Sequence, residues 1–409
     1  MTAMTQTEVT TARGSHAATS GPILEVENLT KYFPVKSSGL LRRTIGQVQA
    51  VDGVSFQVQR GSSLGLVGES GCGKSTTGRL ITRLYDPTTG SMRFDGREIG
   101  KLSNRQMQPL RSEIQMIFQD PYSSLNPRHT VGAIIGTPLR VHKVVPEKQV
   151  LNRVRELLEV VGLNPEHYNR YPSEFSGGQR QRIGIARALA LQPKLLVADE
   201  PVSALDVSIQ AQVMNLLQDV QKEFDIAFLF IAHDLAVVRH FCPEVAVMYL
   251  GKIVEIADRD TLYRRPHHPY TQALLSAVPD VRQAAVGGRR ERIRLEGDVP
   301  SPINPPSGCR FRTRCWMAQD ICAKQEPPLI QIDATHKVSC HFAGERGTAG
   351  AVPVTLSTLG VDRHGSPIAG AQTAEDGHTG PGYAPTWKTL EERTAASAPL
   401  ADANGVSAS

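Results

Sequence analysis

Apolar residues along this chain recur at two spacings. Short, almost continuous apolar runs occupy residues 64–67, 195–198 and 227–232. Runs of this length are typical of strands that are buried on both faces of a parallel sheet. Alternating patterns at 23–33 and 51–58 predict half-buried strands, and the polar, basic residues 36–47 between them predict a hairpin tip or loop.

Helical spacing replaces these patterns in the middle of the chain. Apolar residues recur every three or four positions from Val150 to Val161, and Gly162 follows as a helix-terminating glycine. A second helical face runs from Ile209 to Phe224 between two of the apolar runs. Residues 245–249 and 253–256 flank a Gly-Lys turn and predict an antiparallel pair that closes the domain.

Strands that alternate with helices predict an α/β fold. We expect a mainly parallel sheet, an antiparallel β subdomain, an inserted helical subdomain and a small Cys-rich C-terminal domain. The expected boundaries are a disordered tail at 1–21, the α/β domain at 22–262 with its helical subdomain at about 122–190, a Cys-rich extension at 263–343, and a second tail at 344–409. The last segment is dominated by small and polar residues, which bury too little apolar surface to offset the entropy of ordering.

Composition and charge bear on where the chain is located and what it can bind. Hydrophobic residues make up 40% of the 409 residues, enough for a sizeable core, but no apolar run approaches the roughly 18 residues of a membrane span. The first 20 residues lack the apolar stretch of a signal peptide, so we expect the chain in the cytoplasm. The net charge of +5 is compatible with either a membrane surface or nucleic acid and decides neither.

The strongest chemical signal lies between the apolar run 64–67 and a predicted helix. Its pattern, G-x-x-x-x-G-K-S, is typical of a loop that binds phosphates through backbone N–H groups and a helix N-terminus. The lysine can reach the outer phosphates, and the serine hydroxyl can ligate Mg²⁺. A glycine-rich connector without a ligand is the alternative. The candidate ATP-binding residues are Gly68, Glu69, Ser70, Gly71, Cys72, Gly73, Lys74, Ser75 and Thr76.

A second motif consists of Ser176, Gly177, Gly178 and Gln179. Ser-x-x-Gln is a capping box, and capping alone would explain it. A helix that needs only a cap gains nothing from two glycines, however, because each costs about 1 kcal/mol in a helix. The exposed amides at this N-terminus also suit phosphate binding.

With this motif located, residues 22–262 resemble the ATP-binding cassette (ABC) ATPases, and the motifs follow the order of that family. Phe175 stands where leucine is commoner in the family. Tyr32 could take the place of its neighbour Phe33 as the aromatic residue that stacks on adenine. The matching positions are Phe33 for the adenine-stacking aromatic, Gln119 for the Q-loop, Asp199 and Glu200 for Walker B, Asp206 in the D-loop Ser-Ala-Leu-Asp, and His233 for the switch histidine.

The resemblance implies a role for each of these residues. Ser75, Gln119 and Asp199 would hold Mg²⁺, a hard cation that prefers oxygen ligands. Glu200 would position or deprotonate the attacking water, with His233 and Gln119 completing the catalytic set. An Asp-Glu pair or a lone histidine would not by itself indicate metal binding or catalysis. Here both follow strands whose carboxyl ends share a sheet edge with the phosphate loop.

The family resemblance also implies partners. The residues 176–179 would close over ATP that is bound to a second cassette, so hydrolysis would require a dimer. The sequences around 118–128, 267–275 and 297–311 resemble the second ATPase subunit of oligopeptide/dipeptide permeases. That subfamily implies a related ATPase partner, two transmembrane permease subunits and an extracytoplasmic substrate-binding protein, with this chain on the cytoplasmic face of the membrane. Nickel and glutathione importers share the extension.

The extension contains four of the six cysteines: Cys309, Cys315, Cys322 and Cys340. Their spacing matches neither common zinc fingers nor the usual ferredoxin runs, so zinc, an iron–sulfur cluster and no metal all stay open. The permease subfamily is associated with a [4Fe–4S] cluster here, which favours a structural cluster. Packed, reduced cysteines are the alternative.

Two functions other than peptide import fit the sequence less well. A cassette ATPase that acts on nucleic acid or ribosomes usually carries two cassettes or long coiled coils, and this chain shows neither, so we expect no nucleic-acid partner. An adaptor that binds ATP without turnover is disfavoured because Glu200 and His233 are both present.

Overall fold

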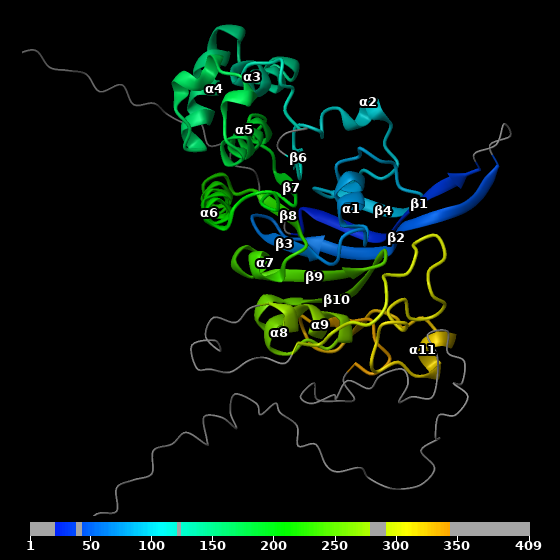
Figure 1. Ribbon diagram of the computed structural model, residues 1–409. Helices are drawn as coiled ribbons and strands as arrows, with labels where there is room; N and C mark the ends of the chain where they lie inside the picture. Colours follow the sequence, from blue (N-terminus) through cyan, green and yellow to red (C-terminus); the bar gives the residue numbers. More distant parts are fainter. Residues whose placement is uncertain (1–20, 38–42, 121–123, 279–291, 344–409) are drawn as a thin grey trace, which may run out of the picture.

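The computed structural model describes residues 21–37, 43–120, 124–278 and 292–343 (Figure 1). The two tails predicted to be disordered lie outside the described residues, apart from Gly21.

The main sheet has the strand order β11-β12-β10-β9-β3-β8-β7-β6. Five neighbouring strands run parallel, as the continuous apolar runs predict: β9 (Glu244–Tyr249), β3 (Ser63–Val67), β8 (Ala227–Ala232), β7 (Leu195–Asp199) and β6 (Ile114–Ile117).

Both faces of this sheet are buried. Along β7, Leu196 and Ala198 belong to one apolar core, whereas Leu195 and Val197 belong to the other. This alternation follows from the two-residue period of a strand. A strand buried on both faces has no polar side to show in its sequence, which explains its continuous apolar run.

Three strands extend the sheet antiparallel at one edge. β10 (Lys252–Asp258) pairs with β9 as predicted, through a turn at Leu250 and Gly251 with positive φ. β12 (Lys337–Val338) and β11 (Ile330–Gln331) come from the C-terminal extension and continue the same sheet. Within the described residues the extension therefore continues the α/β domain, and a separate Cys-rich domain is not confirmed.

A buried carboxylate reinforces this junction. Glu255 on β10 is fully buried, and its Oε1 lies 2.7 Å from Nε2 of His336, which is also fully buried. Glu255 also accepts hydrogen bonds from the backbone N–H groups of His267 and His268, at 2.7 and 3.1 Å. A buried carboxylate needs such partners because water cannot replace them.

The second sheet is antiparallel, with the order β2-β1-β4-β5. Its strands are β1 (Leu24–Lys36), β2 (Thr44–Val58), β4 (Thr89–Phe94) and β5 (Arg97–Glu98). The predicted loop at 36–47 is wrong in extent, because β1 includes Lys36 and β2 already begins at Thr44. The ladder continues through polar residues because its outer part is half exposed and needs no apolar pattern.

Some helices cover the parallel sheet, and others form a separate layer beside β6 and β7 (Figure 1). The layer occupies the predicted helical subdomain and contains α3 (Val131–Val141), α4 (Glu147–Val160), the 3₁₀ turns Pro165–Asn169 and Pro172–Glu174, and α5 (Gly177–Leu189). The others are α1 (Lys74–Ile81), α2 (Asn104–Met107), α6 (Val207–Phe224), α7 (Leu235–Phe241), α8 (Arg259–Arg264), α9 (Pro269–Ala277) and α11 (Asp320–Lys324).

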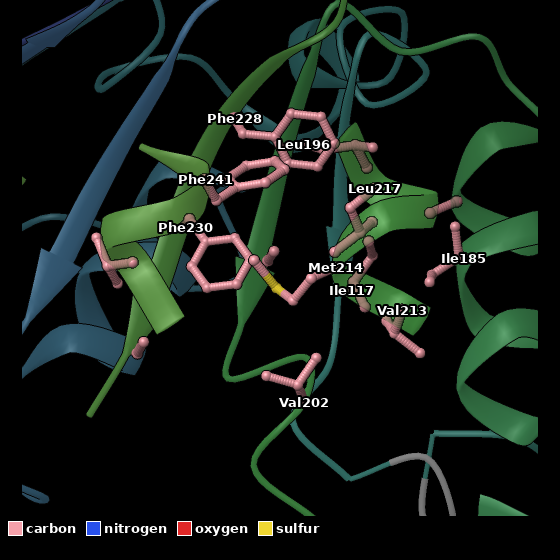
Figure 2. Packing of buried hydrophobic residues seen from close by; sticks show 14 of the residues in the cluster. Ile117, Ile185, Leu196, Val202, Val213, Met214, Leu217, Phe228, Phe230 and Phe241 are labelled. Atoms are coloured by element: carbon pink, nitrogen blue, oxygen red, sulfur yellow. The ribbon is translucent and has the colours of Figure 1, made fainter. Parts of the chain in front are cut away.

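Aromatic residues fill the core between the sheet and α6 and α7. Figure 2 shows Phe228, Phe230 and Phe241 packed together beside Met214 and Leu217. The ring centroids of Phe228 and Phe230 lie 5.2 and 5.0 Å from that of Phe241. Burying such a side chain contributes roughly 1.5–3 kcal/mol, so this core holds β8 and the strands beside it in place under the site.

Candidate functional site

The glycine-rich loop joins the end of β3 to the start of α1, as predicted. Gly71 and Gly73 have φ values of 80° and 108°, a region that favours glycine. A Cβ on Gly68 would lie 2.1 Å from the carbonyl oxygen of Met248, and one on Gly73 would lie 2.1 Å from that of Ala50. The loop can fold against these strands only with glycine at both positions.

The N-terminus of α1 offers donors to an anion. Its capping residue is Gly73, which has no side chain to occupy the first amides. Lys74 is 4% exposed, and its Nζ donates to the carbonyl oxygens of Gly68 and Glu69 at 2.7 and 3.0 Å. A phosphate between these groups would meet backbone N–H groups and an ammonium together.

Two of the predicted magnesium ligands lie in contact. The Ser75 hydroxyl donates to Oδ1 of Asp199 at 2.8 Å. Asp199 is 2% exposed at the end of β7, and burial raises the pKa of its carboxyl group. A divalent cation beside these two oxygens would offset the desolvation of the carboxylate, so the pair fits Mg²⁺.

Glu200 lies between the other two predicted catalytic side chains. Its Oε2 accepts from Nε2 of Gln119 at 3.1 Å and lies 3.2 Å from Nδ1 of His233. Gln119 comes from the end of β6 and His233 from the end of β8, so three neighbouring strands bring these groups together. Gln119 therefore contacts Glu200 rather than Ser75 or Asp199 in this structure.

The backbone at Glu200 is unusual. Its φ is 45°, a left-handed conformation that non-glycine residues rarely adopt. Its amide donates to the carbonyl of Ile231 at 2.9 Å, while its own carbonyl accepts from Ser203. Such strain is found where the fold fixes a side chain for function. Here it directs Glu200 toward Gln119 and His233.

The Ser-Gly-Gly-Gln residues lie at the start of α5, which belongs to the helical layer (Figure 1). Ser176 caps α5, and the reciprocal capping box with Gln179 is present. Gly178 packs against α6, where a Cβ would lie 2.4 Å from Cγ2 of Ile209. The capping interpretation is confirmed. Asp206 occupies the N-cap position of α6 without a side-chain capping bond, and the next residue, Val207, is 82% exposed.

The candidate adenine-stacking residue, Phe33, is partly exposed on β1. Its ring lies 5.4 Å from that of Tyr85 and 5.1 Å from Nζ of Lys31. Tyr32 is engaged elsewhere, because its hydroxyl donates to Asp52 at 2.7 Å. Burial, together with Asp52, raises the pKa of Tyr32 to about 12. Of the two aromatic residues, Phe33 is the better placed to stack on a base.

One set of contacts could not be predicted from the sequence. Arg314 and Tyr270, both from the extension, bind Glu69 of the glycine-rich loop, and Arg310 binds Asp52. The sequence segments that contain these residues carry a family resemblance but no chemical motif, and only the folded chain places them beside the loop.

The four predicted cysteines line one small pocket. Its lining also includes His268, Phe311 and Met317. Burial raises the pKa of the Cys309 thiol to about 12, and it raises the pKa values of Cys315 and Cys340 as well. Among the described residues, no three His, Cys, Asp or Glu side chains converge closely enough to hold a metal ion. A cluster is therefore not confirmed, and a single zinc ion has no ready site here.

In the part of the chain that the structure describes, none of the helices combines the length and apolarity needed to cross a bilayer.

Comparisons with known proteins agree with this geometry. Residues 51–203 match the family described as ABC transporter, and residues 254–322 match the family described as oligopeptide/dipeptide transporter, C-terminal region. The chain is similar to the oligopeptide transport ATP-binding protein AppF of Bacillus subtilis (strain 168), with 54% identity over 80% of this chain and 99% of that protein. The probable peptide ABC transporter ATP-binding protein y4tS of Sinorhizobium fredii is 50% identical over 84% of this chain and 96% of its own length.

A solved structure is also similar: the ATP-binding cassette MJ0796, described as a dimer in a post-hydrolysis state bound to ADP and Pi. It has a TM-score of 0.51 and 27% identity, and the match covers 58% of this chain and 98% of the cassette. Because relatives with 54% and 50% identity cover 80% and 84% of this chain, and residues 51–203 match the ABC transporter family, the chain belongs to the family of ABC transporter ATP-binding proteins.

Proposed function

We propose that this chain is the ATP-hydrolysing subunit of a transporter that imports oligopeptides or dipeptides. The observation that carries the proposal is the union of two parts in one fold. A nucleotide site with lysine, carboxylates and histidine in place is joined to an extension that matches the oligopeptide/dipeptide C-terminal region. The relatives named for peptide transport support the same substrate class. We place the cassette at 22–262 and the extension at 263–343.

Each residue of the site has a part in hydrolysis. Lys74 and the loop 68–76 bind the phosphates of ATP, while Ser75 and Asp199 bind Mg²⁺, with Gln119 joining them when nucleotide is present. Glu200 positions or deprotonates the attacking water. His233 contacts the γ-phosphate and holds Glu200 in place. The distances of 3.1 and 3.2 Å from Glu200 to its two neighbours support this grouping.

Hydrolysis requires a second cassette. The capped N-terminus at 176–179 closes over ATP that is bound to the partner, and Asp206 lies at the same interface. The high exposure of Val207 next to Asp206 supports a contact that is completed by another subunit. We infer a related cassette as the partner, two transmembrane permease subunits, and an extracytoplasmic binding protein, with this chain peripheral on the cytoplasmic face.

Uptake by whole cells tests the substrate class. In cells that lack this chain, uptake of a labelled tripeptide should stop. The wild-type chain should restore it, and the Lys74→Ala variant should not. Nickel and glutathione uptake are measured in the same cells because importers of both are the alternatives. Loss of either of these with normal peptide uptake would refute the peptide assignment.

We also propose a structural [4Fe–4S] cluster in the extension. Four thiols around one pocket support it, because a cluster spreads its ligands farther apart than a single ion does. Cys309, Cys315, Cys322 and Cys340 would hold it, and thiolate ligation would offset the burial that raises the pKa of the Cys309, Cys315 and Cys340 thiols. The expected finding is iron and acid-labile sulfide in equal amounts in anaerobically purified protein. Stoichiometric zinc without iron would overturn the proposal.

A further inference from the structure

The extension binds one residue of the phosphate loop from two sides. The guanidinium of Arg314 contacts the Glu69 carboxylate with both terminal nitrogens, at 2.7 and 3.1 Å. The backbone N–H of Glu69 donates to the hydroxyl of Tyr270 at 2.8 Å. Tyr270 is fully buried on α9, and the Arg314 side chain is 8% exposed over the ring of Tyr249. Glu69 is thus fixed by groups that lie outside the cassette.

These contacts bear directly on the binding lysine. Nζ of Lys74 donates to the carbonyl oxygens of Gly68 and Glu69. A rotation of the peptide units around Glu69 would move both carbonyls and the amides that follow them. The loop has little stiffness of its own, because Gly71 and Gly73 adopt backbone conformations that glycine leaves easily. An external anchor therefore contributes to the shape of the loop before nucleotide arrives.

A neighbouring arginine acts at the other side of the site. Arg310 donates to the carbonyl of Leu250 at 2.6 Å and to the carboxylate of Asp52. Asp52 in turn accepts from Tyr32, the neighbour of Phe33. Arg310 and Arg314 lie on one short loop, directly after Cys309 and directly before Cys315. The same loop thus lines the cysteine pocket and contacts both Glu69 of the phosphate loop and Asp52 on β2.

We propose that Arg314 is a positioning residue for ATP binding: through its two-pronged contact with Glu69 it holds the phosphate loop in its binding shape. The proposal goes beyond peptide import, because it concerns nucleotide affinity and holds whatever substrate is transported. Preorganisation of this kind lowers the cost of ordering the loop when the ligand binds. Its loss should therefore weaken binding of Mg-ATP more than it slows the chemical step.

The test measures the dissociation constant for Mg-ATP on the full-length chain, and KM and kcat on the same chain paired with its partner cassette. Arg314→Met keeps the apolar stem of the side chain and removes the guanidinium that makes the contact. The expected result is a rise in Kd and KM of roughly 5- to 100-fold, the range typical of coupling between two sites, with kcat changed far less. Glu69→Gln should raise Kd similarly. The Kd of the double variant should be no higher than that of the single variant with the higher Kd, because the two changes remove the same interaction.

Arg312→Met is the matched control. Arg312 lies on the same loop, is half-buried, and directs its guanidinium to the backbone carbonyl and the hydroxyl of Ser307 rather than to the phosphate loop, so its removal should leave Kd unchanged. A wild-type Kd in the Arg314→Met variant overturns the proposal, as does an equal rise in both arginine variants. Should Arg314→Met fail to fold, Glu69→Gln decides: a raised Kd supports the anchor, and a wild-type Kd refutes it.

Discussion

At the scale of single residues, the site is organised around Glu200. Three strand ends supply Gln119, Glu200 and His233, and a left-handed backbone directs the carboxylate between the other two. The neighbouring Asp199 has a different role, since it is bonded to Ser75 and buried. Two adjacent carboxylates thus occupy different environments, one suited to a metal ion and one to a water molecule.

Replacing Glu200 by Gln should separate binding from turnover. The amide keeps the size of the side chain but cannot accept a proton, so we expect ATP hydrolysis to fall by roughly 100- to 10,000-fold. The affinity for Mg-ATP should persist, and ATP-bound dimers should accumulate in gel filtration with the partner cassette. Glu223→Gln, an exposed change on α6, is the control. Normal turnover in the Glu200 variant would show that another group activates water.

At the scale of elements, α5 illustrates how one helix can need glycine at one position and not at another. Gly178 packs closely on α6, whereas a Cβ on Gly184 in the same helix would meet nothing within 4 Å. Gly178 is required for packing against α6, whereas Gly184 lowers the stability of the helix and no neighbouring group requires its small size.

The same substitution at these two sites should therefore have opposite effects. Gly178→Ala should push α5 away from α6 and lower the free energy of unfolding by roughly 1–3 kcal/mol. Gly184→Ala should raise it by up to about 1 kcal/mol. Chemical denaturation of both variants measures the two changes in the free energy of unfolding. A destabilised Gly184 variant would mean that α5 is packed more tightly than the structure indicates.

A second element, α8, depends on an acidic cap. Asp258 accepts from the backbone N–H of Thr261 at 2.9 Å and from the hydroxyl of Thr335 at 2.7 Å. Although its partial burial opposes ionisation, these bonds lower its pKa from 3.8 to about 2. A lowered pKa in the folded state stabilises the fold above the unfolded value and loses that effect as the pH falls toward 2.

Asp258→Ala should therefore cost about 1 kcal/mol near neutral pH. The difference from wild type should shrink as the pH falls through about 4 toward about 2. Urea titrations at several pH values measure it, with Asp260→Ala, an exposed neighbour, as the control. A difference that stays constant with pH would mean that the charge of Asp258 does not contribute.

How much the sequence could reveal also depends on the element. The parallel strands were predictable because burial on both faces leaves a continuous apolar run, and the loop 68–76 because its chemistry needs a fixed spacing. The outer part of the β1–β2 ladder was not predictable, since its residues 44–47 are exposed or half-exposed and show no alternation of apolar and polar positions. The contacts of Arg314 and Arg310 were also beyond prediction, because they join positions more than 200 residues apart through an irregular segment.

At the scale of the whole molecule, the described part of the extension shares the main sheet of the ATPase and does not form a separate unit. It adds β12 and β11 to the main sheet, and it contacts the glycine loop and β2 through two arginines. The segment that distinguishes the oligopeptide/dipeptide group therefore lies against the nucleotide site that the wider family shares.

The pairing of β12 with β10 also limits how this protein can be cut. A fragment that stops at residue 322, where the second family match ends, would lack β12 and His336. β10 would become an open edge, a known template for aggregation, and Glu255 would lose a buried partner at a cost of roughly 1–3 kcal/mol. We expect such a fragment to precipitate while one ending at residue 343 stays in solution, which a sedimentation assay would reveal. The smallest piece of this chain that folds is thus longer than its recognisable sequence motifs.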